Sequence, residues 1–179
     1  MSTPVPRRPE PIDPVKAPTT ERQALIEFLD FYRDVLARKA EGLRAEDLAR
    51  TTAASDLTIG GLIKHMALVE DIWFRVRFLG EAPVEPWASA PWDDDPDWEL
   101  SSAADDSPEQ LLALFDEACE RSRRISDAAP TVETMSAGDP LGRGPWNLRW
   151  ILVHMIEEYA RHVGHADLIR EAIDGETGD

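Results

Sequence analysis

The residues best suited to chemistry are four histidines, His65, His154, His162 and His165, together with Glu158. Glu158 and His162 have i,i+4 spacing, so on a helix both side chains can reach one point above its surface. A carboxylate and two neutral imidazoles suit a catalytic zinc ion that keeps one coordination position open, and they also suit ferrous iron. The residue types therefore indicate a metal site, provided that the fold brings a third ligand to Glu158 and His162.

Helical periodicity predicts the elements that must position these residues. Four segments repeat apolar residues at helical spacing and are bounded by capping residues, glycine or proline: 19–42, 58–80, 107–129 and 147–173. No stretch of useful length alternates polar and apolar residues with period two. We therefore predict an all-α fold, a four-helix bundle in which a long crossover, residues 81–106, joins the second helix to the third.

The angular positions of the candidate ligands favour one set. At about 100° per residue, the buried stripe of the fourth helix includes His162, with Glu158 about 20° and His165 about 40° beyond its edge. His154 lies farther out, and His65 falls within the apolar stripe of the second helix. A buried carboxylate costs several kcal/mol unless it is paired or metal-bound, so we predict His65, Glu158 and His162 as ligands. Spacing leaves open competing sets with His154 or His165, and a hydrogen-bonded core pair without metal.

The composition of the chain excludes several classes of protein. The chain has 179 residues, which fits one compact domain, and its 19 basic against 35 acidic residues give a net charge of −16. This charge repels nucleic acid and anionic membranes, and no apolar run approaches the roughly 18 residues of a membrane span. The single cysteine, Cys119, rules out an intramolecular disulfide and is predicted to be a buried core residue. We therefore expect a soluble, cytoplasmic protein without nucleic-acid or membrane partners.

Proline and tryptophan content mark two further segments. Residues 1–18 hold six prolines and are predicted to form an extended N-terminal arm, whereas residues 19–179 form the helical domain. The crossover carries three tryptophans and is expected to cover the bundle, while those of the helices are expected to be core or anchoring residues. The crossover tryptophans are Trp87, Trp92 and Trp98, and the helix tryptophans are Trp73, Trp146 and Trp150.

Two motifs resemble the DinB-like superfamily. Residues 57–70, LTIGGLIKHMALVE, with Trp73-Phe74 and Gly80 after them, resemble its second helix, and residues 157–167, EEYARHVGHAD, resemble its fourth. The likeness spans most of residues 20–175 and is closest to the mini-circle-type branch of unknown function, which is related to the mycothiol-dependent maleylpyruvate isomerase N-terminal domain. The resemblance implies an up-down-down-up four-helix bundle, a homodimer, and a divalent metal held by the second and fourth helices.

Carried over by position, the resemblance places metal ligands at His65, Glu158 and His162, with His165 in the place of a glutamine. This set departs from the three-histidine version seen in many relatives. It is similar to the His/Glu/His set of the maleylpyruvate isomerase branch. The implied metal is zinc, with nickel or iron as alternatives.

The implied activity is that of a metal-dependent S-transferase for a low-molecular-weight thiol such as mycothiol, acting on a small-molecule electrophile. A metal ion with an open position lowers the pKa of a bound thiol and so supplies a nucleophile at neutral pH. Three alternatives stay open: a non-catalytic, stress-related metal-binding protein, a metal-dependent hydrolase, and a helical interaction module.

Overall fold

The computed structural model describes residues 2–10, 14, 20–53, 55–139 and 141–177. Throughout these residues the regular structure is helical, and β-pairing is limited to the isolated bridges Thr52–Ser55 and Met135–Asn147. The prediction of an all-α fold is therefore confirmed. None of the described helices is long and apolar enough to cross a membrane.

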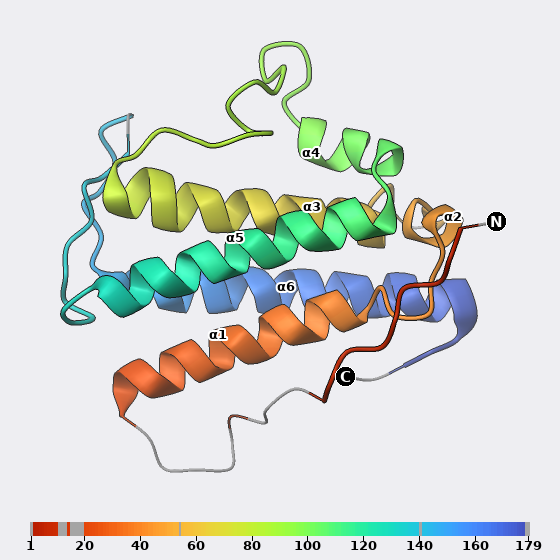
Figure 1. Ribbon diagram of the computed structural model, residues 1–179, viewed down its shortest axis with the longest axis horizontal. Coiled ribbons are helices and arrows are strands. Elements are labelled where there is room, and N and C mark those ends of the chain that lie inside the picture. The colour runs from red at the N-terminus through yellow and green to blue at the C-terminus, as the bar shows by residue number, and fades with distance from the viewer. Residues whose placement is uncertain (1, 11–13, 15–19, 54, 140, 178–179) are drawn as a thin grey trace.

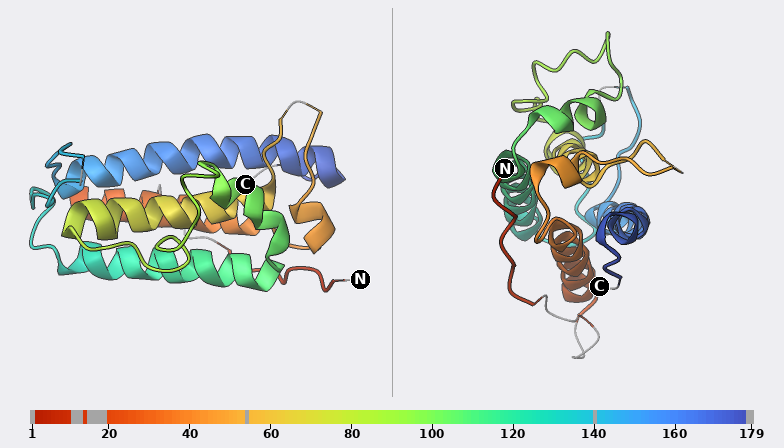
Figure 2. Two further views of the ribbon diagram at one scale, coloured as in Figure 1. Left: turned by 90° about the horizontal axis from the view of Figure 1, so that it is seen from above. Right: turned by 90° about the vertical axis from the view of Figure 1, so that its right-hand side faces the viewer.

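Four long α-helices lie side by side, and shorter helical pieces connect them (Figures 1 and 2). The long helices are α1 (Glu21–Arg38), α3 (Ile59–Glu70), α5 (Pro108–Ala128) and α6 (Leu148–Asp174). The shorter ones are α2 (Ala45–Leu48), η2 (Asp71–Leu79), α4 (Trp98–Ser101) and η3 (Ser102–Asp105). α6 packs against α1 and α3, and α3 also packs against α5 and lies beneath α4. The candidate ligands thus sit on two adjacent helices, α3 and α6.

Each long helix begins where its capping residue predicts. The side chains of Thr20, Thr58, Ser107 and Asn147 each accept a hydrogen bond from the backbone N–H three residues further on. Gln110 completes a capping box by accepting a hydrogen bond from the backbone N–H of Ser107. These bonds satisfy amide groups that a helix leaves unpaired at its N-terminus, so the start of each helix is encoded locally.

The interior and end of the second predicted helix differ from expectation. Residues 58–80 are predicted as one α-helix, but from Asp71 to Leu79 the turns widen into a π-helix, in which bonds join residues five apart. Trp73, Phe74 and Phe78 are buried along this segment. Over nine residues the apolar pattern does not distinguish a turn of 3.6 residues from a wider one, so periodicity could not predict the change. Likewise, α1 ends at Arg38 rather than near Gly42.

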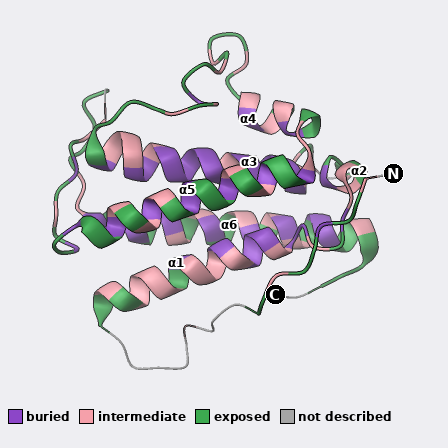
Figure 3. Ribbon diagram, in the orientation of Figure 1, coloured by how far each residue is buried: buried purple, intermediate pink, exposed green. Residues whose placement is uncertain are grey.

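The buried residues, whose places along the helices Figure 3 shows, are largely apolar, and a polar network around Glu70 lies among them. Arg33 donates two hydrogen bonds to the carboxylate of Glu70, at 2.8 and 2.7 Å, and the hydroxyl of Tyr159 donates a third at 2.7 Å. The Cys119 sulfur lies 3.7 Å from the Tyr159 hydroxyl. Burial, followed by the nearby Glu70 carboxylate, raises the pKa of the Cys119 thiol. Cys119 is therefore an unreactive core residue, as predicted.

The described part of the N-terminal arm lies along the helical domain. Val5 is buried, its N–H donates to the carbonyl of Leu43 at 2.9 Å, and its own carbonyl accepts from Gly42 at 2.8 Å. Arg8 forms an ion pair of 2.6 Å with Asp116 of α5. Residues 1, 11–13 and 15–18 of the predicted arm fall outside the described residues.

The crossover packs onto α3 as a cover. Trp87 is buried, and Trp98 meets both Trp87 and Trp92 edge to face, with ring centroids 6.3 and 5.9 Å apart. Lys64 of α3 lies 4.5 Å above the Trp98 ring. The crossover includes α4 and η3, two short helices that the sequence pattern did not predict.

Candidate metal centre

Two of the predicted ligands meet across the boundary between α3 and α6. The rings of His65 and His162 lie with centroids 4.9 Å apart and an interplanar angle of 68°. Both side chains are half-buried. The antiparallel course of the two helices places residues near the middle of α3 opposite residues in the second half of α6, which explains why these histidines face each other.

The third predicted ligand, Glu158, lies between two histidines of its own helix. Its Oε2 is 3.6 Å from His162 Nε2, and its Oε1 is 3.3 Å from His154 Nε2. Both neighbours follow from i,i+4 spacing, because residues four apart lie on one face of a helix. Glu158 is therefore placed to join either the predicted set or a set that includes His154.

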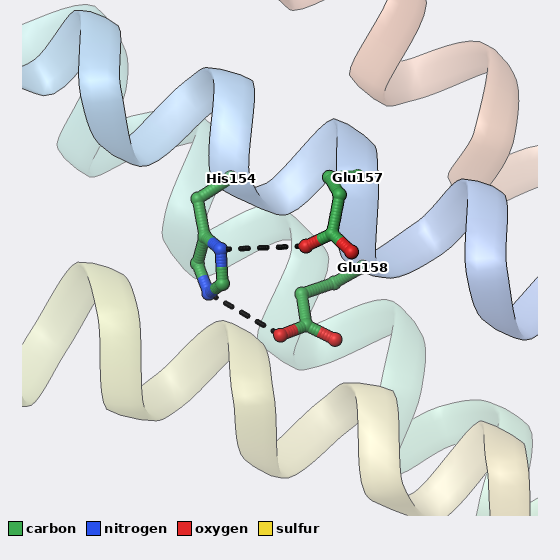
Figure 4. A group of neighbouring side chains, drawn as sticks. All are labelled: His154, Glu157 and Glu158. Atoms are coloured by element: carbon green, nitrogen blue, oxygen red, sulfur yellow. Dashed lines mark ion pairs between the residues drawn. The ribbon is translucent and has the colours of Figure 1, made fainter.

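A second candidate group lies one turn away on α6. His154 presents one ring nitrogen to Glu158 and the other to Glu157, whose Oε2 is 3.6 Å from His154 Nδ1 (Figure 4). In the described chain, these three form the group whose potential ligand atoms all lie within 4.8 Å of one another. Glu158 belongs to both sets, whereas His65 and His162 stand outside this tight group. The His154 side chain is 22 % exposed, as is that of Glu158, and the contact between them keeps His154 as a competing ligand, as its i,i+4 spacing predicted.

Electrostatics keep His162 in the form that binds metal ions. Burial lowers the pKa of its imidazole to about 4, and the nearby rings of His65 and His165 act in the same direction. The neutral ring is the metal-binding form, so no proton has to be displaced at neutral pH. Its Nδ1 is buried and has no hydrogen-bond partner among the described residues. An unpaired buried nitrogen is costly, and a bound ion or ligand would satisfy it.

Two tryptophan rings pack against His154. The Trp150 ring stacks on His154 with centroids 5.1 Å apart, and Trp73 meets the same histidine edge to face at 4.4 Å. Of these two helix tryptophans, which were expected to be core or anchoring residues, Trp73 is buried, whereas Trp150 is 44 % exposed and lies outside the core. It also stacks on Trp146, with ring centroids 5.7 Å apart, so it packs on the rings four residues before it and four residues after it in the chain.

A pocket of about 390 Å³ opens at the N-terminal end of α3. Its lining includes Thr58, Gly61, Asp97 and Ser101. Gly61 lies one turn before His65 on the same face of α3, although none of the candidate ligands lines the pocket itself. Hydroxyl and carboxylate groups in this lining suit a polar ligand.

Glu99 contacts His65, and the sequence pattern did not predict this contact. Its Oε1 lies 2.9 Å from His65 Nδ1, at hydrogen-bond distance. Glu99 lies in α4 of the crossover, where no periodicity or spacing relates it to His65. Only the packing of α4 on α3 brings the two together.

A family model matches most of the chain. The model described as mycothiol-S-transferase matches residues 24–175, a span that contains every candidate ligand of both sets. No protein of curated function matches the chain. Because the match extends over far more than half of the residues, the chain belongs to the mycothiol-S-transferase family, whose members are transferase enzymes with mycothiol as cosubstrate.

Proposed function

We propose that this transferase works with a divalent metal ion, zinc, held by His65, Glu158 and His162. The observation that carries the proposal is the approach of His65 to His162 from two different helices, with ring centroids 4.9 Å apart, beside the Glu158 carboxylate. The buried, unpaired Nδ1 of His162 adds support, because a buried nitrogen without a partner indicates a site built for a ligand.

The competing set on α6 is less suited to catalysis. Its Glu157 side chain is 48 % exposed and also pairs with Arg161 on the outer face of the helix. An ion held there would be bound by a single helix at the surface. The His65, Glu158 and His162 set draws on two helices, and its side chains are all half-buried, which restricts the access of water.

The donor set fits the chemistry that an S-transferase needs. When bound, zinc with two imidazoles and one carboxylate would act as a Lewis acid that lowers the pKa of a thiol. The chain's own residues would orient the reactants. The pocket beside Thr58 and Asp97 is proposed to receive the polar part of the thiol, and the exposed part of the Trp150 side chain is proposed to contact an apolar electrophile.

The finer architecture is also a proposal. We propose a four-helix bundle with up-down-down-up topology, which is supported by the equal direction of α3 and α5 on either side of the long crossover (Figure 1). Residues 1–18 would form the arm and 19–179 the bundle domain. A homodimer is expected from the resemblance, and a cytoplasmic location is consistent with the single cysteine.

Elemental mass spectrometry of untagged protein tests the metal site. About one equivalent of metal per chain is expected in the wild type and in His154→Ala and Glu157→Ala. Loss is expected in His65→Ala, Glu158→Ala and His162→Ala. Retention in His65→Ala and His162→Ala with loss in His154→Ala would move the ion to the competing set. Absence of metal after incubation of the wild type with zinc, nickel or ferrous iron would overturn metal dependence.

Turnover assays then test the chemistry. With a reactive electrophile, product formation is expected to require both mycothiol and the metal. Turnover that continues without thiol would identify a metal-dependent hydrolase. A metal-loaded protein that gives no turnover across a panel of electrophiles would instead favour a non-catalytic metal-binding role.

A further inference from the structure

The crossover contributes one buried carboxylate to the back of the candidate site. Glu99 of α4 is 6 % exposed, and its Oε1 lies 2.9 Å from Nδ1 of His65. Its other oxygen, Oε2, is buried and has no hydrogen-bond partner among the described residues. Burying a carboxylate is costly, so a residue kept in this position is expected to have a specific task.

The chemistry of imidazole shows what that task is. A neutral histidine carries its proton on one ring nitrogen and leaves a lone pair on the other. A carboxylate oxygen accepts a hydrogen bond from an imidazole N–H, so the 2.9 Å contact with Glu99 Oε1 favours the tautomer that carries the proton on Nδ1. Nε2 of His65 is then left with its lone pair, as a metal ligand requires.

Contacts on both sides of Glu99 fix the short helix α4 against α3. Lys64, the neighbour of His65, donates hydrogen bonds to Ser102 at 2.8 Å and to Asp106 at 2.6 Å, and its ammonium group covers Trp98. Leu100 of α4 packs beside Gly61 of α3, where a Cβ would lie 3.5 Å from the Leu100 side chain, an ordinary packing distance. Glu99 is thus held at a defined place relative to His65.

We propose that Glu99 is a positioning residue, which fixes the ring orientation and the Nδ1–H tautomer of His65 and so presents Nε2 to the metal. The crossover therefore completes the site in addition to covering it. The inference rests on the proposed function, since His65 needs such positioning only if it is a metal ligand. Hydrogen-bonded carboxylates behind metal-binding histidines typically change metal affinity by about 10–100-fold.

The tautomer of His65 tests the contact without any metal. Two-bond ¹H–¹⁵N spectra of metal-free protein are expected to place the His65 proton on Nδ1 in the wild type. Glu99→Gln should retain this tautomer, because its amide oxygen still accepts the hydrogen bond, whereas Glu99→Ala should give a mixture. A wild-type proton on Nε2 would overturn the proposal. The spectra of the wild type and Glu99→Gln decide this point even if Glu99→Ala does not fold.

Measurements of zinc affinity test whether Glu99 strengthens metal binding through His65. In competition with a chromophoric chelator, zinc affinity is expected to fall about 10–100-fold in Glu99→Ala and less in Glu99→Gln. The matched control is Asp94→Ala, an exposed acid in the same crossover, which should bind zinc as the wild type does. Wild-type affinity in Glu99→Ala would overturn the positioning role alone. Zinc binding that survives in His65→Ala, or is absent from the wild type, would instead overturn the proposed metal site.

Discussion

The rings of His65 of α3 and His162 of α6 are in edge-to-face contact, with centroids 4.9 Å apart, although most of the helical domain separates the two residues in sequence. The antiparallel packing of the two helices brings them together. Glu158 stands one turn before His162, and Glu99 stands behind His65. The site therefore depends on three separate elements, α3, α4 and α6, holding their relative positions.

Zinc is expected to stabilise the folded protein. A ligand that binds only the native state adds about 4 kcal/mol when its concentration is 1,000 times its dissociation constant. Thermal unfolding of chelator-treated wild type should therefore shift to higher Tm when zinc is added. Glu157→Ala should show the same shift, and His162→Ala should show little. An equal shift in His162→Ala would contradict the assignment of this residue as a ligand.

The buried network around Glu70 is expected to be essential for stability. Glu70→Ala would leave the buried Arg33 with the partly exposed Asp30 as its acidic partner among the described residues, at a cost of about 3–5 kcal/mol. Tyr159→Phe removes one hydrogen bond to Glu70 and should cost about 1–2 kcal/mol.

Urea unfolding followed by circular dichroism measures both changes. The control is Arg124→Ala, which removes an exposed pair with Glu120 and should change the free energy of unfolding by less than about 1 kcal/mol. A Glu70→Ala value no larger than this control would show that Arg33 is adequately paired without Glu70.

Asp71 is expected to destabilise the fold at neutral pH. Burial raises the pKa of its carboxyl, and Arg121, whose Nε lies 3.5 Å away, opposes the shift only in part. Because the folded pKa exceeds the unfolded one, the native state binds the proton more tightly, and this contribution to stability is lost as pH rises through the folded pKa. Asp71→Asn should therefore be more stable than the wild type at pH 7.

Urea unfolding across a pH series tests whether the charge of Asp71 lowers the free energy of unfolding. The advantage of Asp71→Asn should shrink as the pH falls and vanish once the wild-type carboxyl is protonated in both states. Asp94→Asn, an exposed acid, serves as control and should show no such pH-dependent gain. A stability difference that does not change with pH would indicate that Asp71 acts through packing rather than through its charge.

The N-terminal arm is expected to contribute to the stability of the helical domain through Val5. This side chain is 6 % exposed and lies where the arm pairs with residues 42–43. Val5→Ala removes buried methyl groups and should lower the free energy of unfolding by roughly 1–2 kcal/mol. Glu10→Ala, at an exposed ion pair with Arg38, should change it much less. Equal effects of the two substitutions in urea unfolding would argue against a packed arm.

The long helices, and the helix faces that carry the candidate ligands, follow from local features of the sequence. Apolar spacing repeats with each helical turn, and capping residues such as Thr58 and Asn147 bond to amides only three residues away. Both signals are local, so they can be read without knowledge of the fold. The i,i+4 relation of Glu158 to His162 and to His154 is local in the same sense.

The contacts between residues of different elements depend instead on how the helices pack together. The Glu99–His65 contact and the Arg33–Glu70 pair join segments whose sequence patterns are unrelated. The position of His154 against Trp73 depends on how α6 packs on the π-helical turns of η2. Such contacts arise from the burial of whole helix faces, which is non-directional and involves many residues at once. Periodicity therefore identifies the face of a helix, while packing selects the partner that the face meets.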